Sequence, residues 1–283
     1  NIAAALVATT DDAITFTGSA MNDTIVVDST AAAVVSTKAV SISDSTTTDS
    51  DTLSLKAAGN AISFTNLSLS NIEKLIVDDT AAVTINASAI SGKAIAVNGA
   101  AAGDILNLKG TAGADVIDLS KITDGGNDAV FAITGLAGAD TFVGSVFSDS
   151  YVIADASVDS TSAAMDSITS FTIGAGKDTI NLATAANGTT ASGAITFAVA
   201  GNVAAVAGTT NGIATGMFTF DKAAATSLSD AITKVGADVT TAGNAVIFEY
   251  AGDTYFFADT DGAATTTSDL IIKLVGVDST SMT

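Results

Sequence analysis

A short unit recurs between residues 99 and 182: a glycine-rich turn, then an aspartate, then a run of apolar residues. Two of its copies read GTAGADVIDL and GLAGADTFV. The aspartates that begin these runs are Asp104, Asp115, Asp128, Asp140, Asp149 and Asp178. Glycine reaches backbone angles that other residues avoid, so it suits tight corners between short strands. Such a unit, repeated along a chain, is typical of a parallel β-solenoid.

Each unit also carries the oxygen ligands that a calcium ion prefers, namely aspartate carboxylates and turn carbonyls. We therefore predict calcium binding by the residues Asp104, Gly110, Gly113, Asp115, Asp128, Gly135, Gly138, Asp140, Asp149, Gly174, Gly176 and Asp178. The copies depart from the full repeat, because Thr111 and Leu136 stand where a glycine is expected. An alternative stays open, in which these aspartates only cap turns through hydrogen bonds.

The residue types present exclude several functions. The chain has no cysteine and no histidine, so disulfides, thiol chemistry and histidine-based catalytic triads are impossible. Neighbouring acids such as Asp78 and Asp79 would point to opposite faces of a strand, and we predict that the chain is not an enzyme. A net charge of -20 argues against nucleic acid as a partner. No apolar run is long enough to cross a bilayer, so membrane insertion is not expected.

Apolar runs recur about every ten residues, which suits the rungs of a solenoid or the strands of a sandwich. We predict three parts. Residues 1–98 form a β-rich solenoid part, residues 99–217 form a glycine–aspartate β-roll or β-helix, and residues 218–283 form a C-terminal module. The expected fold class is therefore mostly all-β, a parallel β-helix or β-roll followed by a small mixed β module with one helix.

The local signals in two segments are more specific. A helix is predicted over residues 222–236, with Ser227 or Ser229 as its N-cap and Gly236 just after its last turn. The segment after it, NAVIFEYAGDTYFFADTDG, predicts a β-hairpin. The polar segment 44–51, DSTTTDSD, is expected to be a disordered loop.

A second group of acids lies near the C-terminus, at Asp253, Asp259, Asp261 and Asp269. The segment ADTDGAATTTSDL superficially follows an EF-hand loop. It lacks an oxygen ligand and the glutamate that the loop requires, and it lies between predicted strands. We favour a hairpin turn over a metal site here.

Three segments resemble those of a known group of proteins. GTAGADVIDLS and GLAGADTF look like the RTX-type repeats of proteins exported by Gram-negative type I secretion. NIEKLIV and VTINASAISGKAIAVNG are similar to the β-helical stretch before such repeats in bacterial S-layer proteins of the Caulobacter and Campylobacter kinds. The segment from AVIFEYAGDTYFF to LIIKLVGVD resembles the C-terminal secretion module of type I secreted proteins. The resemblance covers most of residues 60–278.

The resemblance implies a C-terminal region of an S-layer protein that is exported, folds with extracellular Ca²⁺ and assembles with its own copies into a lattice on the cell surface. Lipopolysaccharide would be a further partner at that surface. Two alternatives remain open. The first is a secreted adhesin or carbohydrate-binding solenoid, and the second is the non-catalytic C-terminal part of a type I secreted hydrolase.

Overall fold

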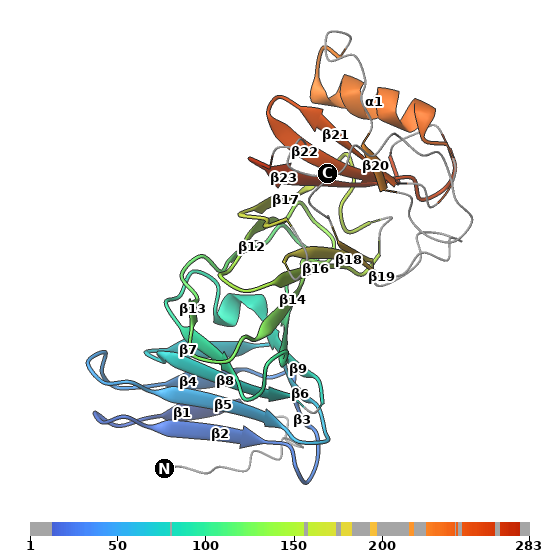
Figure 1. Cartoon of the computed structure of the whole chain (residues 1–283). Helices are drawn as coiled ribbons and strands as arrows, with labels where there is room; N and C mark the ends of the chain where they lie inside the picture. The colour runs from blue at the N-terminus through green and yellow to red at the C-terminus, as the bar shows by residue number, and fades with distance from the viewer. Residues whose placement is uncertain are drawn as a thin grey trace. The chain divides into compact units, whose positions relative to one another are not determined.

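The computed structural model describes residues 13–79, 81–155, 158–173, 177–182, 193–196, 215–217, 225–240, 242, 245–263 and 267–277. The protein is mostly β, with parallel sheets that form a β-solenoid of about six turns and a mixed sheet at the C-terminus (Figure 1). This confirms the predicted fold class.

The chain divides into two compact units. The first contains the chain up to Gly110 together with Ile117–Ile133 and Ser145–Asp149. The second contains Thr111–Val116, Thr134–Gly144 and the chain from Ser150 onward.

The first unit winds its strands into three parallel faces (Figure 1). One face contains β1 (Ile14–Thr17), β4 (Val40–Ser43) and β7 (Leu67–Ser70). The next contains β2 (Thr24–Asp28), β5 (Thr52–Ala57), β8 (Lys74–Asp79), β10 (Ala96–Gly99) and β13 (Thr123–Asp124). The third contains β3 (Val34–Ser36), β6 (Ile62–Phe64), β9 (Val83–Asn86), β11 (Ile105–Lys109) and β14 (Val130–Thr134). A short 3-10 helix, η1 (Ala87–Ala89), follows β9.

Strand alternation builds the core of this unit. Side chains along β5 are alternately half-buried and buried, because successive residues of a strand point to opposite faces. Leu53 pairs with Leu75 on β8, and Leu75 pairs with Val97 on β10. All three are fully buried, and each such side chain stabilises the fold by about 1.5–3 kcal/mol relative to exposure.

One turn of the solenoid is longer than the predicted rung. Asp23 and Asp51 occupy equivalent corners of successive turns, 28 residues apart. Glu73 occupies the equivalent corner of the next turn, 22 residues after Asp51. The spacing of about ten residues seen in the sequence is therefore the spacing of strands within one turn.

The second unit contains further solenoid strands and the C-terminal sheet. The solenoid strands are β15 (Thr141–Val143), β16 (Asp149–Ile153), β17 (Asp166–Thr169) and β18 (Thr179–Leu182), and β19 (Gly193–Thr196) pairs antiparallel with β18. The strand β12 (Val116–Asp118) has its first residue in this unit and the other two in the first unit. The C-terminal strands are β20 (Thr215–Met217), β21 (Ala245–Tyr250), β22 (Asp253–Ala258) and β23 (Leu270–Val275). β23 pairs antiparallel with β22 and parallel with β17, so one sheet joins the two sets.

The predicted hairpin is confirmed. β21 and β22 pair antiparallel from Tyr250 and Asp253 outward. The two turn residues, Ala251 and Gly252, have φ values of 55° and 87°. Positive φ at both positions matches the right-handed twist of hairpin strands.

The single α-helix of the described part, α1 (Leu228–Asp238), differs from its prediction at both ends. Ser227 is the N-cap and accepts a hydrogen bond from the Asp230 N–H, as predicted. Residues 222–224 of the predicted helix lie outside the described residues. Gly236 does not end the helix, because the chain stays helical until the buried Val239 can pack into the apolar core of the module.

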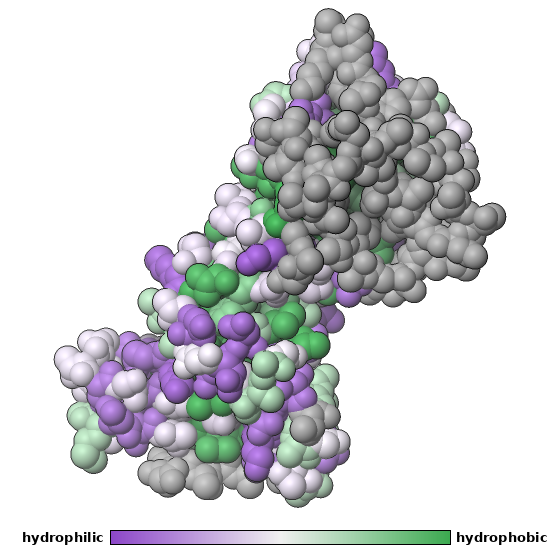
Figure 2. Space-filling model, viewed as in Figure 1, coloured by the Kyte–Doolittle hydropathy of each residue, from purple (hydrophilic) through white to green (hydrophobic). Residues whose placement is uncertain are grey.

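The surface of the solenoid is mixed in polarity. Hydrophilic side chains lie among small hydrophobic ones on the face seen in Figure 2. Exposed large hydrophobic residues such as Met21, Val116 and Val146 occur singly, as is normal for a protein surface. In the part of the chain that the structure describes, no helix has the length and apolarity needed to span a bilayer.

Candidate metal centre

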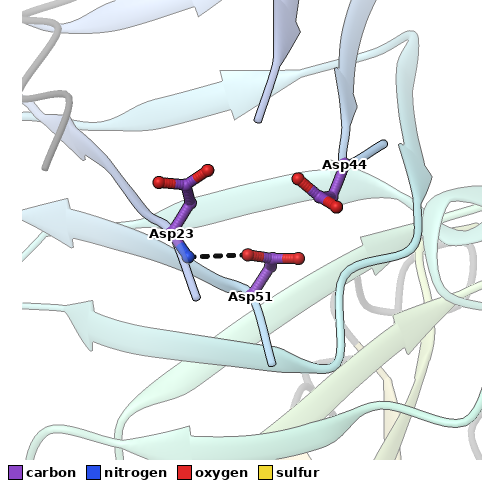
Figure 3. A group of neighbouring side chains, drawn as sticks. All are labelled: Asp23, Asp44 and Asp51. Atoms are coloured by element: carbon purple, nitrogen blue, oxygen red, sulfur yellow. Dashed lines mark hydrogen bonds between the residues drawn. The ribbon is translucent and has the colours of Figure 1, made fainter. Parts of the chain in front are cut away.

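Three aspartates from successive turns of the first unit converge at one corner of the solenoid. Asp23 precedes β2, whereas Asp44 follows β4 and Asp51 precedes β5, one turn further along. Their carboxylate oxygens lie within 4.8 Å of one another, and Figure 3 shows the three side chains facing a common space. We call Asp23, Asp44 and Asp51 the N-terminal cluster.

One carboxylate oxygen of Asp44 accepts hydrogen bonds, and the other has no hydrogen-bond partner. Its Oδ2 accepts hydrogen bonds from the Thr46 N–H at 2.6 Å and from the Thr46 hydroxyl at 3.2 Å. The Asn71 amide donates to the Asp44 carbonyl from the next turn, at 3.1 Å. Asp44 is only 6% exposed, and its Oδ1 is buried without a hydrogen-bond partner.

Asp51 repeats this arrangement. Its Oδ1 accepts a hydrogen bond from the Asp23 N–H at 2.7 Å (Figure 3). Its own N–H donates to Glu73 Oε2 at 2.9 Å. Asp51 is 1% exposed, and its Oδ2 is buried without a partner. Asp49 adds another buried, unpartnered carboxylate oxygen in the same loop.

The electrostatics of the corner favour a bound cation. Burial, followed by the charges of Asp44, Asp49 and Glu73, raises the pKa of Asp51, and the Asp23 N–H opposes this effect. The Ser19 N–H and hydroxyl hold the pKa of Asp23 below its ordinary value. The cluster forms no ion pair within the described part of the chain. A buried carboxylate without a counter-charge is costly, so a cation would stabilise this arrangement.

A glycine leaves room for that cation. A Cβ atom at Gly18 would overlap Asp44 Oδ1 and lie 2.9 Å from Asp23 Oδ2. The space in front of these oxygens is thus open only because residue 18 has no side chain. The donors are all oxygens, at a surface corner where carbonyls and water can complete a shell, which fits Ca²⁺.

The prediction that residues 44–51 form a disordered loop is therefore wrong. Asp44 and Asp51 are buried in it, and the Thr46 hydroxyl bonds to both Asp44 and Asp49. The segment carries few apolar residues, but side-chain oxygens accept hydrogen bonds from its backbone: Asp44 from the Thr46 N–H, Asn22 from the Ser50 N–H and Glu73 from the Asp51 N–H.

Most of the sequence-predicted aspartates cap turns. Asp115 accepts from the Thr111 N–H at 2.6 Å, Asp149 from the Ser145 N–H at 2.7 Å, and Asp178 from the Thr172 N–H at 2.7 Å. Asp104 does the same for the Ala101 N–H at 2.8 Å. These bonds agree with the alternative in which aspartates form turns. Among the described residues, none of the predicted ligands belongs to a group of three converging acids.

The remaining predicted calcium ligands lie elsewhere in the chain. Asp128 is exposed, and its carbonyl accepts a hydrogen bond from the Gly103 N–H at 3.0 Å. Gly110 and Gly113 lie in the turn before Asp115. Gly174 and Gly176 lie outside the described residues.

Gly135 and Gly138 are required by close packing. A Cβ atom at Gly135 would overlap Asp140 Oδ2. At Gly138 a Cβ atom would meet the backbone of Gly113 and Ala114 in the preceding turn, at 2.8–2.9 Å. Gly135 is therefore needed by the packing of its own turn around Asp140, and Gly138 by the stacking of one turn on the next.

Asp115, Asp140 and Asp166 form a ladder across three turns of the second unit. The Asp115 N–H donates to Asp140 Oδ1 at 2.8 Å, and the Asp140 N–H donates to Asp166 Oδ1 at 2.9 Å. Burial raises the pKa of Asp140 to about 6 and that of Asp166 to about 8. The charges of neighbouring acids, including Asp159, add to both increases.

This ladder predicts an unusual pH dependence. A carboxyl whose folded pKa is raised destabilises the fold as pH rises from the unfolded value, about 3.9, to the folded value. In chelator, the free energy of unfolding should therefore fall between pH 5.5 and 8. Asn carries no charge at either pH, so the stability of Asp166→Asn relative to the wild type should increase by about 3 kcal/mol between pH 5.5 and 8. Urea denaturation at both pH values measures this, and a stability difference that does not change with pH would contradict it.

Sequence reasoning missed the N-terminal cluster, although part of its signal was present. Gly18, Ser19 and Asp23 repeat the spacing of Gly110, Thr111 and Asp115, and Ser19 donates to Asp23 at 2.6 Å as Thr111 does to Asp115. That spacing identifies the turn at Asp23. It does not identify Asp44 and Asp51, which reach Asp23 only through the pairing of successive turns.

The sequence gives no match to a known protein family model or to a curated protein.

Proposed function

We propose that this chain is a structural protein of a bacterial surface layer, which is exported, folds with extracellular Ca²⁺ and assembles with its own copies. The observation that carries the calcium part is the meeting of Asp23, Asp44 and Asp51, which bring one carboxylate oxygen each within 4.8 Å of one another, while Asp44 Oδ1 and Asp51 Oδ2 are buried without a hydrogen-bond partner.

Calcium at this corner would couple binding to folding. Asp23 lies before β2 and Asp51 before β5, so an ion held by both ties one turn of the solenoid to the next. In an unfolded chain these carboxylates are not held together, so the free energy of binding contributes directly to folding. Calcium is scarce inside cells and plentiful outside them, and this keeps the chain exportable.

The surface-layer part rests on composition and on the resemblance of three segments. A chain with no cysteine and a net charge of -20 suits an exported protein that folds outside the cell. A solenoid that buries a continuous core and exposes long side faces suits repeated contacts between copies. Dynamic light scattering and negative-stain microscopy test this part. Ordered assemblies in millimolar calcium support it, and a chain that stays monomeric at high concentration contradicts it.

Gly18→Ala tests the calcium part without removing a charge. The added Cβ fills the space in front of Asp44 Oδ1 and Asp23 Oδ2. We expect the variant to bind one Ca²⁺ fewer per chain than the wild type, measured by equilibrium dialysis with radioactive calcium. Circular dichroism reports whether the variant remains folded.

Two further variants complete this experiment. Gly113→Ala is the matched control, since its Cβ would meet only Thr111 Oγ1, at 3.8 Å, and it should bind as the wild type does. Asp51→Asn keeps the oxygen that accepts the Asp23 N–H and removes only charge, so it should also lose one ion. Unchanged binding in both Gly18→Ala and Asp51→Asn would overturn the proposed site.

A further inference from the structure

A second group of converging acids lies in the second unit, in the connection between β22 and β23. Asp259 follows the last residue of β22, and Asp269 precedes the first residue of β23. The carboxylate oxygens of Asp259, Asp261 and Asp269 lie within 4.8 Å of one another. We call these residues the C-terminal cluster.

Asp259 is fixed by the turn that follows it. Its Oδ1 accepts hydrogen bonds from the Asp261 N–H at 3.0 Å and from the Gly262 N–H at 2.6 Å. Gly262 has a φ of +78°, a conformation that favours glycine. Asp259 is 0% exposed, and its Oδ2 is buried with no hydrogen-bond partner.

Asp269 mirrors Asp259 from the other end of the connection. Its Oδ1 accepts a hydrogen bond from the Thr260 N–H at 3.0 Å, whereas its Oδ2 is buried without a partner. Asp269 is also 0% exposed. Asp261 closes the group from the solvent side, where its Oδ2 accepts from the Ser268 hydroxyl at 2.8 Å.

No ion pair with a lysine balances these charges within the described residues. Burial, then the charges of Asp259 and Asp261, raises the pKa of Asp269 to about 6. Burial also raises the pKa of Asp259. Lys273, the cation of the adjacent strand, pairs instead with Asp253 at 2.8 Å. Two fully buried carboxylates therefore face each other and require a cation or a proton between them.

We propose that the C-terminal cluster binds a second Ca²⁺ through Asp259 Oδ2, Asp269 Oδ2 and the Asp261 carboxylate, and that this ion fixes the start of β23. The site is separate from the N-terminal cluster, and it holds whether or not the chain forms a surface layer. Its donors are hard oxygens only. The carboxylates are already held in place by the turn, and this suits the flexible coordination of Ca²⁺ better than the strict octahedron of Mg²⁺.

The position of the ion gives it a structural consequence. β23 is the strand that joins β22 to the solenoid strand β17 within the second unit. The Ile271 N–H, two residues after Asp269, donates to the Ser160 carbonyl at 3.0 Å. Fixing Asp269 therefore fixes the strand through which the C-terminal sheet is hydrogen-bonded to the solenoid.

The effect of Asp269→Asn on stability should change sign between chelator and calcium. In chelator it removes one of two facing buried charges, so at pH 7.5 the variant should melt at a higher temperature than the wild type. In calcium it removes a ligand, so the variant should melt at a lower temperature and bind one Ca²⁺ fewer per chain. Asp128→Asn removes the same charge from an exposed position and should behave as the wild type in both conditions.

Hydrogen exchange of the wild-type chain locates the effect without any variant. Calcium should slow exchange of peptides covering residues 245–263 and 267–277, and millimolar Mg²⁺ alone should not. Protection confined to residues 13–79 would overturn this second site while leaving the N-terminal cluster intact. Equal calcium stoichiometry for wild type and Asp269→Asn would also overturn it, and would indicate that Asp259 and Asp269 share a proton.

Discussion

Gly138→Ala should lower the free energy of unfolding by about 3 kcal/mol, a large effect for a single methyl group. Two causes add. Gly138 has a φ of +137°, which L-residues rarely adopt, and this conformation alone costs about 1 kcal/mol or more. The Cβ would also lie 2.8 Å from the Gly113 carbonyl carbon and 2.9 Å from the Ala114 nitrogen. These are backbone atoms of the preceding turn, so they cannot move aside as a flexible side chain would.

Urea denaturation of Gly138→Ala beside Gly113→Ala checks this expectation. The two glycines lie on touching turns, but only Gly138 combines positive φ with a backbone clash. Gly113→Ala should stay within about 0.5 kcal/mol of the wild type. Equal stability of both variants would show that the turns are not stacked as described.

Calcium should raise the thermal midpoint of the wild-type chain by about 10–20 °C relative to chelator. A ligand present at about 100 times its dissociation constant stabilises by about 2.7 kcal/mol per site. Two sites therefore contribute about 5 kcal/mol, and for a chain of this size each kcal/mol shifts the midpoint by about 2–4 °C. Circular dichroism melts in millimolar calcium and in chelator measure the shift.

The melts also separate the two clusters. Gly18→Ala should lose about half of the calcium-dependent shift, because it retains the C-terminal cluster. Asp269→Asn should lose the other half. A midpoint that calcium does not change would contradict calcium binding at both clusters and reduce their aspartates to turn-forming residues.

The fold could be predicted because its signals are local. Alternation along segments such as TLSLKA predicts a half-buried strand, and the spacing of Gly135, Gly138 and Asp140 predicts a turn. The structure gives these glycines a packing role that sequence spacing alone could not distinguish from metal binding. The end of α1 was placed too early, because burial of Val239 outweighs the helix-ending tendency of Gly236.

The N-terminal cluster could not be predicted in the same way because its members meet only through strand register. Asp51 comes next to Asp23 because β5 pairs with β2, with Thr52 opposite Thr24. Asp44 comes next to Gly18 because β4 pairs with β1, with Ser43 opposite Thr17. The two steps along this corner are 28 and 22 residues, so no fixed spacing in the sequence marks the aspartates that will share a corner. The C-terminal cluster lies within one connection, and its acids were visible in the sequence, but their burial was not.

Anomalous diffraction from crystals grown in millimolar calcium tests the central claim most directly. The expected result is a calcium peak among Asp23, Asp44 and Asp51, with Asp44 Oδ1 and Asp51 Oδ2 about 2.3–2.6 Å from the ion. A corner without such a peak, in which these two oxygens bond to water or share a proton, would contradict the claim.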